Sequence, residues 1–478
     1  MTQNAEKELL EALRQIVGRP HAVSGREAPE SLIDQLQRYE GEARAVVRPG
    51  STEEVARVVA LLAGQGIPIV PQGGNTGLVG AATPDGSGRA VVLSSARLNR
   101  IRDIDLDNDT ITVEAGVRLG QLREAAHEAG RWFPLSLPSQ GSCTVGGNLG
   151  TNAGGTQVIR FGNMRALTLG LEVVTAQGEI WHGLRGLRKD NTGYDLRDLF
   201  IGSEGTLGII TAATLKLFPL PRAERTAFLR VAGLDTVLAL LRHARAGFGA
   251  ALTSFEIIAR SSYDLVSAQA PEYRLPFLPD DTVDSWYVLI EISDENDEAH
   301  ADLSIERVLG EALENGLAQD VLVADSLAQR EAFWALREHG LGVAQRRDGK
   351  NVKHDISLPI SRIPTFVRES AAMLQRVFPG VRIFAHGHAG DGNLHYNVAA
   401  PTPGDDAFIE TYGTAIRAQV HDLVIAHHGS ISAEHGIGQS KLTELLRCKS
   451  PVEIGLMRQI KQALDPGNLL NPGKVLAF

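Results

Sequence analysis

A short segment of the chain concentrates side chains that can bind a metal ion or move a proton. His386, His388, His395 and Asn397 all fall within residues 384–398, FAHGHAGDGNLHYNV. Seven of the 14 histidines lie between residues 386 and 435, so an accidental cluster is a poor explanation. The segment is consistent with three kinds of feature: a metal site, a cluster of catalytic bases, or a polar turn.

The spacing of these side chains predicts a β-hairpin. Residues 382–388 and 394–398 have the composition of strands, and the AGDGN sequence between them is a strong turn signal. We therefore expect His388 and His395 to face each other across the two strands. Side chains two positions apart in a strand point the same way, so Asn397 should share a face with His395.

Two histidines do not complete a catalytic metal site, which needs about three protein ligands and an open position. Glu434, in the sequence SAEHG, is the candidate third ligand. Two imidazoles and one carboxylate suit zinc or another divalent transition ion. The alternative is that His388 and His395 only form hydrogen bonds within a polar turn.

His435 follows Glu434 directly and is the candidate catalytic base. In an extended segment the two side chains would point to opposite sides, so that one could bind the metal while the other faces a substrate. Imidazole suits a base because it titrates nearest to neutral pH. A histidine that caps a helix is the alternative.

The elements that position these side chains belong to a chain too long for one hydrophobic core. Its 478 residues indicate two or three domains. A net charge of −10 without a basic run argues against nucleic-acid binding. Cys143 and Cys448 are far apart in the sequence, so they predict no disulfide framework and fit a reducing compartment.

The N-terminal sequence has neither a signal-peptide pattern nor the composition of a transit peptide, because it is rich in acidic residues. No run of about 18 apolar residues occurs that could span a membrane. We therefore expect a cytoplasmic protein, with peripheral membrane contact left open.

Glycine-rich loops mark the first part of the chain. Ser51 and Glu54 form a capping-box signal before an amphipathic helix, and a short strand then leads into the loop 71–77. Two more such loops lie at 134–156 and 202–210. None of them has the spacing of a Rossmann fingerprint or a P-loop. Glycine backbones can still bring N–H groups close to an anion, so the loops could hold a phosphate chain; tight surface turns are the alternative.

These loops, the C-terminal NPGK sequence and the histidine segments together resemble a known family. The loops are similar to those of vanillyl-alcohol-oxidase-type flavoproteins, and AHGHAGDGNLHYNV and SAEHGIG resemble the FAD-linked D-2-hydroxy-acid dehydrogenases. The resemblance covers nearly the whole chain. It implies an α+β fold with a two-subdomain FAD-binding domain in residues 1–221, a substrate-binding cap domain in 222–420, and a C-terminal segment, 421–478, that completes the FAD domain. Pro219 and Pro221 fit the first of these boundaries.

The resemblance also implies the cofactor site. The residues expected to line FAD are Pro71, Gln72, Gly73, Gly74, Asn75, Thr76, Gly77, Pro138, Ser142, Thr144, Gly147, Asn148, Thr151, Asn152, Gly154, Gly205, Gly208, Ile209, Ile210 and Asn471. Some relatives attach FAD through a histidine in the first glycine loop. Residues 71–77 contain no histidine, so we expect FAD to be bound non-covalently.

For the substrate, the resemblance places Arg337 and Lys353 at positions that bind carboxylates, with Asn397 as a further contact, and gives His388, His395 and Glu434 as metal ligands. Arginine offers a bidentate fork and lysine a point charge. The family's hydroxyglutarate members have a hydroxyl residue one helical turn after the arginine, where this chain has Leu341. A shorter substrate therefore becomes an alternative.

The expected activity is FAD-dependent, metal-assisted oxidation of a D-2-hydroxy acid, with D-2-hydroxyglutarate preferred over D-lactate, D-malate or glycolate. The expected electron acceptor is an electron-transfer flavoprotein, a quinone or a cytochrome, and a homodimer is possible. A different class of function is a flavin-carrying subunit of an electron-transfer complex without substrate chemistry of its own.

Overall fold

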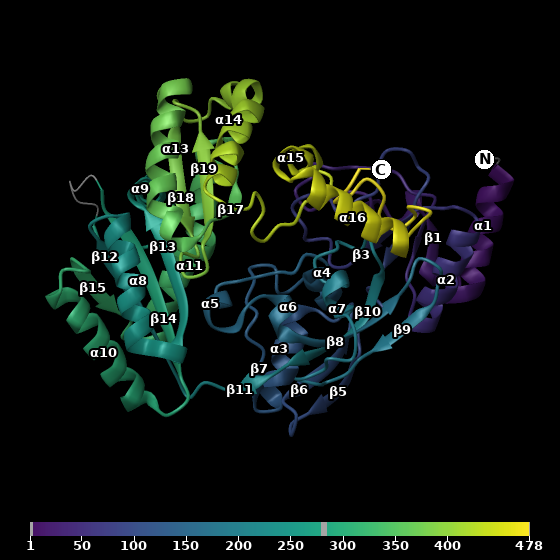
Figure 1. Ribbon diagram of the computed structural model, residues 1–478, viewed down its shortest axis with the longest axis horizontal. Coiled ribbons are helices and arrows are strands. Elements are labelled where there is room, and N and C mark those ends of the chain that lie inside the picture. Colours follow the sequence, from purple (N-terminus) through teal and green to yellow (C-terminus); the bar gives the residue numbers. More distant parts are fainter. Residues whose placement is uncertain (1–2, 279–283, 478) are drawn as a thin grey trace. The chain divides into compact units, whose positions relative to one another are not determined.

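The computed structural model describes residues 3–278 and 284–477 and divides the chain into two compact units (Figure 1). The first unit comprises Met1–Gly154, Gly162–Leu220 and Glu434–Phe478, and the second comprises Gly155–Phe161 and Pro221–Ala433. The first unit therefore gives way to the second at residue 220. The C-terminal return to the first unit begins at Glu434, since residue 420 lies inside the helix α14, Asp406–Ala426.

The first unit opens with a sheet of short, mostly parallel strands. Its strand order is β1-β2-β4-β3, in which β1 is antiparallel to β2 and the other pairs are parallel. The strands are β1 Ala22–Ser24, β2 Ala45–Val47, β3 Ile69–Gln72 and β4 Val91–Ser94. The segment around Leu470 runs beside β3, because Ile69 donates to Leu469 O and Asn471 donates to Ile69 O.

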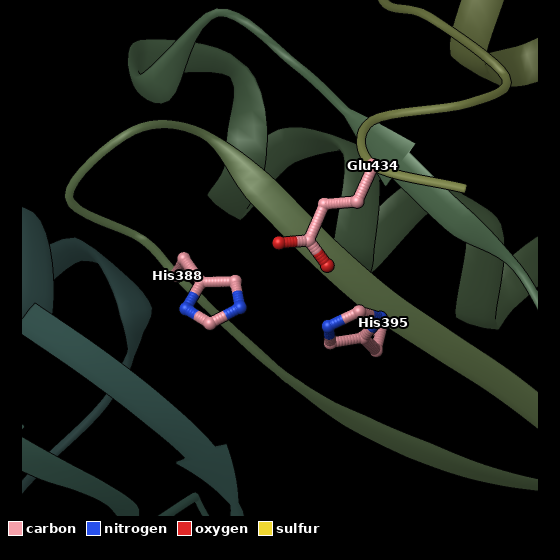
Figure 2. Close-up of side chains that lie close together, drawn as sticks. All are labelled: His388, His395 and Glu434. Atoms are coloured by element: carbon pink, nitrogen blue, oxygen red, sulfur yellow. The ribbon is translucent and has the colours of Figure 1, made fainter. Parts of the chain in front are cut away.

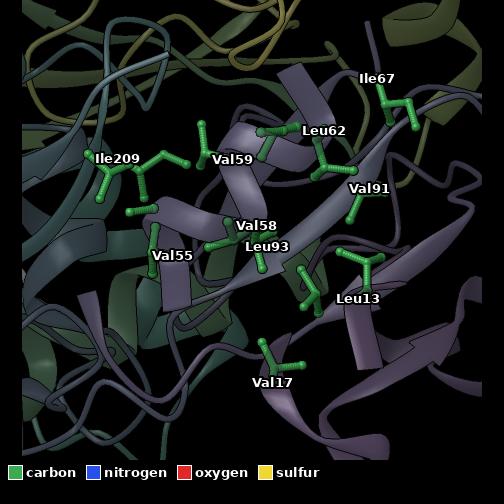
Figure 3. Close-up of a cluster of buried hydrophobic side chains, with 14 of the residues drawn as sticks. Leu13, Val17, Val55, Val58, Val59, Leu62, Ile67, Val91, Leu93 and Ile209 are labelled. Carbon is green, nitrogen blue, oxygen red and sulfur yellow. The ribbon is translucent and has the colours of Figure 1, made fainter. Parts of the chain in front are cut away.

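Two helices of the same unit, α1 (Gln3–Val17) and α2 (Thr52–Gly64), contribute to a shared apolar core (Figure 3). Ser51 caps α2 by accepting a hydrogen bond from Glu54 N, and the Glu54 carboxylate accepts from Gly50 N at 2.7 Å. The helix face predicted from the sequence is buried in this core. Its members are Val55, Val58, Val59 and Leu62.

A second sheet of the first unit is antiparallel throughout, with the order β5-β6-β10-β8-β9. Its strands are β5 Ile101–Asp105, β6 Thr110–Glu114, β8 Thr168–Val174, β9 Ile180–Gly183 and β10 Ile209–Lys216, and β7 Arg131–Trp132 pairs separately with β11 Phe218–Pro219. The helices of this part are α3 Leu119–Glu128, α4 Val145–Gly150, α6 Met164–Leu167 and α7 Arg197–Phe200, and the C-terminal helices are α15 Leu442–Cys448 and α16 Pro451–Leu464.

The second unit is built on one large antiparallel sheet with the order β15-β12-β14-β13-β18-β19-β16, and β17 also pairs with β19. The strands are β12 Ala223–Val231, β13 Leu252–Ala259, β14 Trp286–Asp294, β15 Asp320–Val323, β16 Asn351–Val352, β17 Asp355–Ser357, β18 Arg382–Gly387 and β19 Asn393–Ala399. The helices are α5 Val158–Phe161, α8 Leu234–Phe248, α9 Arg260–Gln269, α10 Glu298–Glu314, α11 Leu327–Ala335, α12 Leu341–Asp348, α13 Ile363–Val377 and α14, with a π-helical turn, η5, at Leu336–Gly340. Short 3-10 turns elsewhere in the chain are η1 Arg19–His21, η2 Gly25–Glu27, η3 Pro29–Ser31, η4 Gly249–Ala251 and η6 Ile360–Arg362.

Aromatic and aliphatic side chains hold helices against this large sheet. Phe228, Tyr287 and Leu289 from the sheet form one cluster with Tyr263 of α9 and Phe333 of α11. Tyr263 and Tyr287 stack with their ring centres 3.7 Å apart. Together the two units confirm the predicted α+β class, and the antiparallel sheet supplies the rigid support for the histidine segment.

Candidate active site

The histidine segment forms the predicted hairpin, made of β18 and β19. In the observed register His386, rather than His388, lies directly opposite His395. His388 follows the end of β18, in the turn, and its ring centre lies 5.7 Å from that of His395. The turn depends on Gly392, whose φ is +91° and at which a Cβ would lie 2.4 Å from Leu358 O. His388 and His395 therefore approach each other diagonally across the hairpin, and not as the directly opposite pair that the sequence predicted.

Nitrogen and oxygen atoms of His388, His395 and Glu434 lie within 4.8 Å of one another, so these three side chains could hold a metal ion. Figure 2 shows the Glu434 carboxylate pointing toward the two imidazole rings. Glu434 is the first residue after the second unit, and the preceding residue, Ala433, donates its N–H to Asp355 O of β17 at 3.2 Å. The backbone next to Glu434 is thus hydrogen-bonded to the same sheet that carries the histidines.

A carboxylate lies beside the Nδ1 atom of each histidine. His388 Nδ1 is 2.6 Å from Glu256 Oε1, and His395 Nδ1 is 3.9 Å from Asp355 Oδ1. A metal-ligating histidine commonly gives its second ring nitrogen to a carboxylate, which fixes the ring and raises its basicity. The donor set and its carboxylate neighbours therefore fit a divalent transition metal such as zinc.

Arg337 lies in η5, where the helix widens by one residue per turn, and only 7% of its side chain is exposed. Its Nη2 atom lies 2.8 Å from Glu256 Oε2, but off the line of its N–H bonds. Nε and Nη2 of Arg337 therefore have no hydrogen-bond partner among the described residues. Buried, unpartnered guanidinium donors are costly unless an anion binds them, so Arg337 is well suited to a substrate carboxylate.

Burial by itself would raise the pKa of Glu256, but the adjacent His388 and Arg337 hold that pKa below its usual value. Burial, with contributions from Arg337 and the neighbouring histidines, lowers the pKa of His386 well below its usual value. His386 is therefore neutral, and its Nδ1 atom has no hydrogen-bond partner among the described residues. Glu256 carries a charge at neutral pH inside a fully buried strand.

The other predicted substrate residues have different surroundings. Lys353 is exposed and lies between β16 and β17, not within a strand. Asn397 is buried, donating from Nδ2 to Gln345 Oε1 at 2.8 Å and accepting from His354 N at 3.3 Å. One N–H of its side-chain amide remains for a further contact.

His435 does not point away from Glu434 in the simple manner of an extended strand. Both side chains approach Asp355, and the three have potential ligand atoms within 4.8 Å of one another. The residues from 431 to 440 form bends and turns. His435 therefore lies beside the candidate metal ligands, in an acidic environment.

In the first unit, the three glycine loops pack against one another. A Cβ at Gly74 would lie 2.0 Å from Ser142 O, and a Cβ at Gly73 would lie 2.5 Å from Thr144 Oγ1. Gly205 has a φ of +70° and packs on Pro71. Three separate stretches of the sequence thus form one compact, glycine-lined surface.

Left-handed backbone conformations at non-glycine residues recur in the same loops. Asn75, Asn152, Glu204 and Asn471 all have φ between +46° and +52°. Such conformations cost free energy and cluster at functional sites. Asn471 also ties the C-terminal segment to the third loop, since its Nδ2 donates to Glu204 O at 2.8 Å. The NPGK sequence is therefore part of this glycine-lined surface.

Several side chains expected to line FAD make hydrogen bonds that shape the loops. Asn75 Nδ2 donates to Ile33 O, Asn152 Oδ1 accepts from Arg165 N, and Thr144 caps the short helix α4 by accepting from Gly147 N. The loop 134–156 therefore contains a helix that the sequence pattern did not predict. Ile209 lies in the apolar core (Figure 3), where its side chain packs with those of α2.

Three buried carboxylates near the site were missed by the sequence analysis, and one of them is Asp355, beside His395 and His435. Glu256 contacts both His388 and Arg337, as described above. Glu204 accepts hydrogen bonds from Ile437 N at 2.7 Å and Gly438 N at 2.8 Å, directly after His435. Burial raises the pKa of Glu204, an effect that these two N–H groups partly oppose. The signal for Glu256 was available, because a lone acid in the apolar strand LTSFEIIA needs a buried partner.

Comparisons with known proteins place these features in a family. The family models described as "FAD linked oxidases, C-terminal domain" and "FAD binding domain" match residues 220–475 and 43–183. The mitochondrial D-2-hydroxyglutarate dehydrogenase of Arabidopsis thaliana is 36% identical over 466 residues, which cover 97% of this chain and 80% of that protein. The D-2-hydroxyglutarate dehydrogenase of Xanthomonas citri pv. viticola is 38% identical, covering 92% of this chain and 91% of that protein.

Solved structures confirm the fold. A structure of p-cresol methylhydroxylase with substrate bound matches with a TM-score of 0.76 at 20% identity, covering 99% of this chain and 97% of that chain. A structure of alkyldihydroxyacetonephosphate synthase matches with a TM-score of 0.74 at 18% identity, covering 98% and 86%. These likenesses confirm the predicted fold of the vanillyl-alcohol-oxidase type.

One prediction is corrected by the comparisons. The expected cytoplasmic location is contradicted, because the similar dehydrogenases from Arabidopsis thaliana, Bos taurus and Rattus norvegicus are all named mitochondrial. Among residues 3–278 and 284–477, no helix has the length and apolar character needed to cross a membrane. From its matched domains, its fold and its similarity to D-2-hydroxyglutarate dehydrogenases over most of its length, the chain belongs to the FAD-linked oxidase family and is an FAD-dependent oxidoreductase.

Proposed function

We propose that the protein oxidises a D-2-hydroxy acid to the 2-oxo acid, with D-2-hydroxyglutarate as the preferred substrate. The observation that carries this proposal is the group of His388, His395 and Glu434 with the buried guanidinium of Arg337 close to it through Glu256. Relatives named D-2-hydroxyglutarate dehydrogenases support the substrate class. A flavin carrier without substrate chemistry would need none of these side chains.

FAD would supply the redox chemistry, and a metal ion would polarise the substrate hydroxyl. Bound FAD provides the acceptor for the hydride that leaves the substrate Cα. A divalent cation, zinc according to the donor set, would be held by His388, His395 and Glu434 and would lower the pKa of the substrate hydroxyl. The glycine-lined surface of loops 71–77, 134–156 and 202–210 would hold FAD without a covalent bond.

The chain's own residues orient the substrate and move its proton. Arg337, whose Nη2 faces Glu256, offers its Nε donor to a substrate carboxylate, and Lys353 adds a second positive charge. His435 accepts the hydroxyl proton at a ring nitrogen as the hydride leaves. Asn397 contributes one amide N–H to the substrate.

The two units would divide this work. The unit that contains the glycine loops would hold FAD, and the one built on the large antiparallel sheet would bind the substrate. Reoxidation of the flavin would fall to an electron-transfer flavoprotein, a quinone or a cytochrome, and a homodimer is the proposed assembly.

A second candidate substrate is a shorter acid, D-lactate or D-malate. Leu341 lies one turn after Arg337 and is 2% exposed, packed among the aromatic side chains of the second unit. As an aliphatic side chain, Leu341 has no hydroxyl that could donate to a distal carboxylate. Glycolate, which is shorter still, is a further candidate among these short 2-hydroxy acids.

Anaerobic flavin reduction tests the proposed function. The purified protein is mixed with D- and L-2-hydroxyglutarate, D-lactate, D-malate and glycolate, and bleaching of the flavin absorbance is followed in a stopped-flow instrument. We expect D-2-hydroxyglutarate to bleach the flavin fastest. Removal of metal by a chelator should stop bleaching while FAD stays bound, and added Zn²⁺ should restore it. Absence of bleaching with every acid tested would contradict the proposed activity.

A further inference from the structure

We infer that Glu256 is a positioning residue that joins the metal half of the site to its carboxylate-binding half. The inference rests on the proposed function, and it adds a residue that the substrate and the metal do not touch. Each of its two carboxylate oxygens faces a different functional side chain. Oε1 faces His388, and Oε2 faces Arg337.

The contact with His388 fixes which ring nitrogen can bind a metal. His388 Nδ1 lies 2.6 Å from Glu256 Oε1, and both side chains are buried. An ionised carboxylate can only accept a hydrogen bond, so Nδ1 carries the proton and donates it. Nε2 is then the ring nitrogen left to offer its lone pair to a metal ion.

The contact with Arg337 holds the guanidinium in place before any substrate arrives. Arg337 Nη2 lies 2.8 Å from Glu256 Oε2, at the wide turn η5. A long side chain with five N–H donors would otherwise sample several rotamers, and ordering it on binding costs free energy. Glu256 thus leaves unpartnered donors of Arg337 in a fixed position for an anion.

The position of Glu256 in the fold makes an incidental role a poor explanation. It lies in β13, every residue of which is buried, and β13 pairs with β18 at Ile258 and His386. A charge in such a strand is expensive unless it is paired and hydrogen-bonded. Among the described residues, Glu256 forms ion pairs with His388 and Arg337, the two side chains that the proposed chemistry needs.

A neighbouring strand offers a matched control. Glu291 of β14 is also buried, and its carboxylate accepts from Thr226, Arg330 and Trp334. It is a carboxylate in the same sheet, and its hydrogen bonds to Thr226, Arg330 and Trp334 involve neither His388 nor Arg337. Replacing it changes a buried carboxylate of the same sheet without touching the site.

The experiment compares Glu256→Gln, Glu256→Asp and Glu291→Gln with the wild-type holoenzyme. Zinc is removed, and the dissociation constant for Zn²⁺ is measured by competition with a chromophoric chelator; Co²⁺ is then added and its visible spectrum recorded. KM and kcat for D-2-hydroxyglutarate are measured at saturating zinc. Flavin content and urea unfolding check that each variant is folded.

We expect Glu256→Gln to weaken zinc binding about 10–100-fold, the usual loss when a carboxylate behind a ligating histidine is changed. KM should rise about 10-fold or more, because Arg337 is no longer held, and the cobalt spectrum should change. Glu256→Asp keeps the carboxylate, so its zinc affinity and KM should lie between those of the wild type and Glu256→Gln. It also serves as the test variant if Glu256→Gln does not fold. Glu291→Gln should keep both constants within about twofold of the wild type.

Two failures are distinguishable. In the first, the wild-type protein binds zinc, and Glu256→Gln keeps the wild-type zinc affinity and KM. The positioning role is then overturned while the proposed function stands. If the Gln variant does not fold, Glu256→Asp decides in the same way. If the wild-type protein binds no divalent cation, the metal part of the proposed function fails, and the inference fails with it.

Discussion

Replacement of Glu204 by alanine should loosen the segment that carries His435. The Glu204 carboxylate accepts from Ile437 N at 2.7 Å and from Gly438 N at 2.8 Å, and it lies against Gly436. Its backbone carbonyl accepts from Asn471 Nδ2. One buried side chain therefore connects the third glycine loop to the segment immediately after His435.

The size of the effect follows from the two N–H groups. A buried donor left without a partner costs about 1–3 kcal/mol, so two such donors cost about 2–6 kcal/mol in Glu204→Ala. For a unit of this size, 1 kcal/mol shifts the melting temperature by roughly 2 °C, which gives a loss of about 4–12 °C. Glu204→Gln keeps one acceptor oxygen and should lose about half as much.

Thermal unfolding followed by circular dichroism and by flavin fluorescence measures this loss. Glu172→Gln is the control, since Glu172 is a buried carboxylate of the same unit that contacts Thr52, Arg102 and Thr211 instead. We expect the Glu204 variants, but not the Glu172 variant, to lose turnover and FAD before global unfolding. A melting temperature for Glu204→Ala within about 2 °C of the wild type would refute the reasoning.

Three further predictions concern single side chains. Arg337→Met should lower kcat/KM about 10–150-fold, the equivalent of one charge-assisted hydrogen bond, and an unchanged kcat/KM in steady-state assays would remove Arg337 from substrate binding. His435→Gln should reduce turnover far more than FAD content; a larger loss of FAD in absorbance spectra would make His435 structural. Burial lowers the pKa of Lys474 to about 8, so the folded state disfavours its charge. The neutral amine therefore contributes stability above the unfolded pKa, and this contribution is lost as the pH falls through 8. It is worth about 3 kcal/mol in the free energy of unfolding between pH 10.5 and 8, measured by urea unfolding. Lys474→Met should remove this pH dependence, and identical pH profiles for the variant and the wild type would contradict the prediction.

Local sequence rules predicted the elements that carry the site because the relevant signals were short-range. The turn signal AGDGN predicted the β18–β19 hairpin, and Ser51 predicted the start of α2. The register of the hairpin was harder to predict, since it depends on where the turn begins. With the turn at residues 388–392, His386 faces His395, and His388 belongs to the turn.

The residues that sequence reasoning missed are those whose function depends on long-range contacts. Glu256 and His388 are 132 positions apart, and Glu204 and Ile437 are 233 positions apart. No periodicity or spacing relates such pairs, because strand order in a large antiparallel sheet brings them together. The sequence does show that an acidic residue lies within an apolar strand. Burying a carboxylate without a partner costs free energy, so Glu256 implies a cation or hydrogen-bond donor nearby without identifying it. That rule predicts the existence of the contact, and only the strand order β14-β13-β18 identifies His388 as the partner.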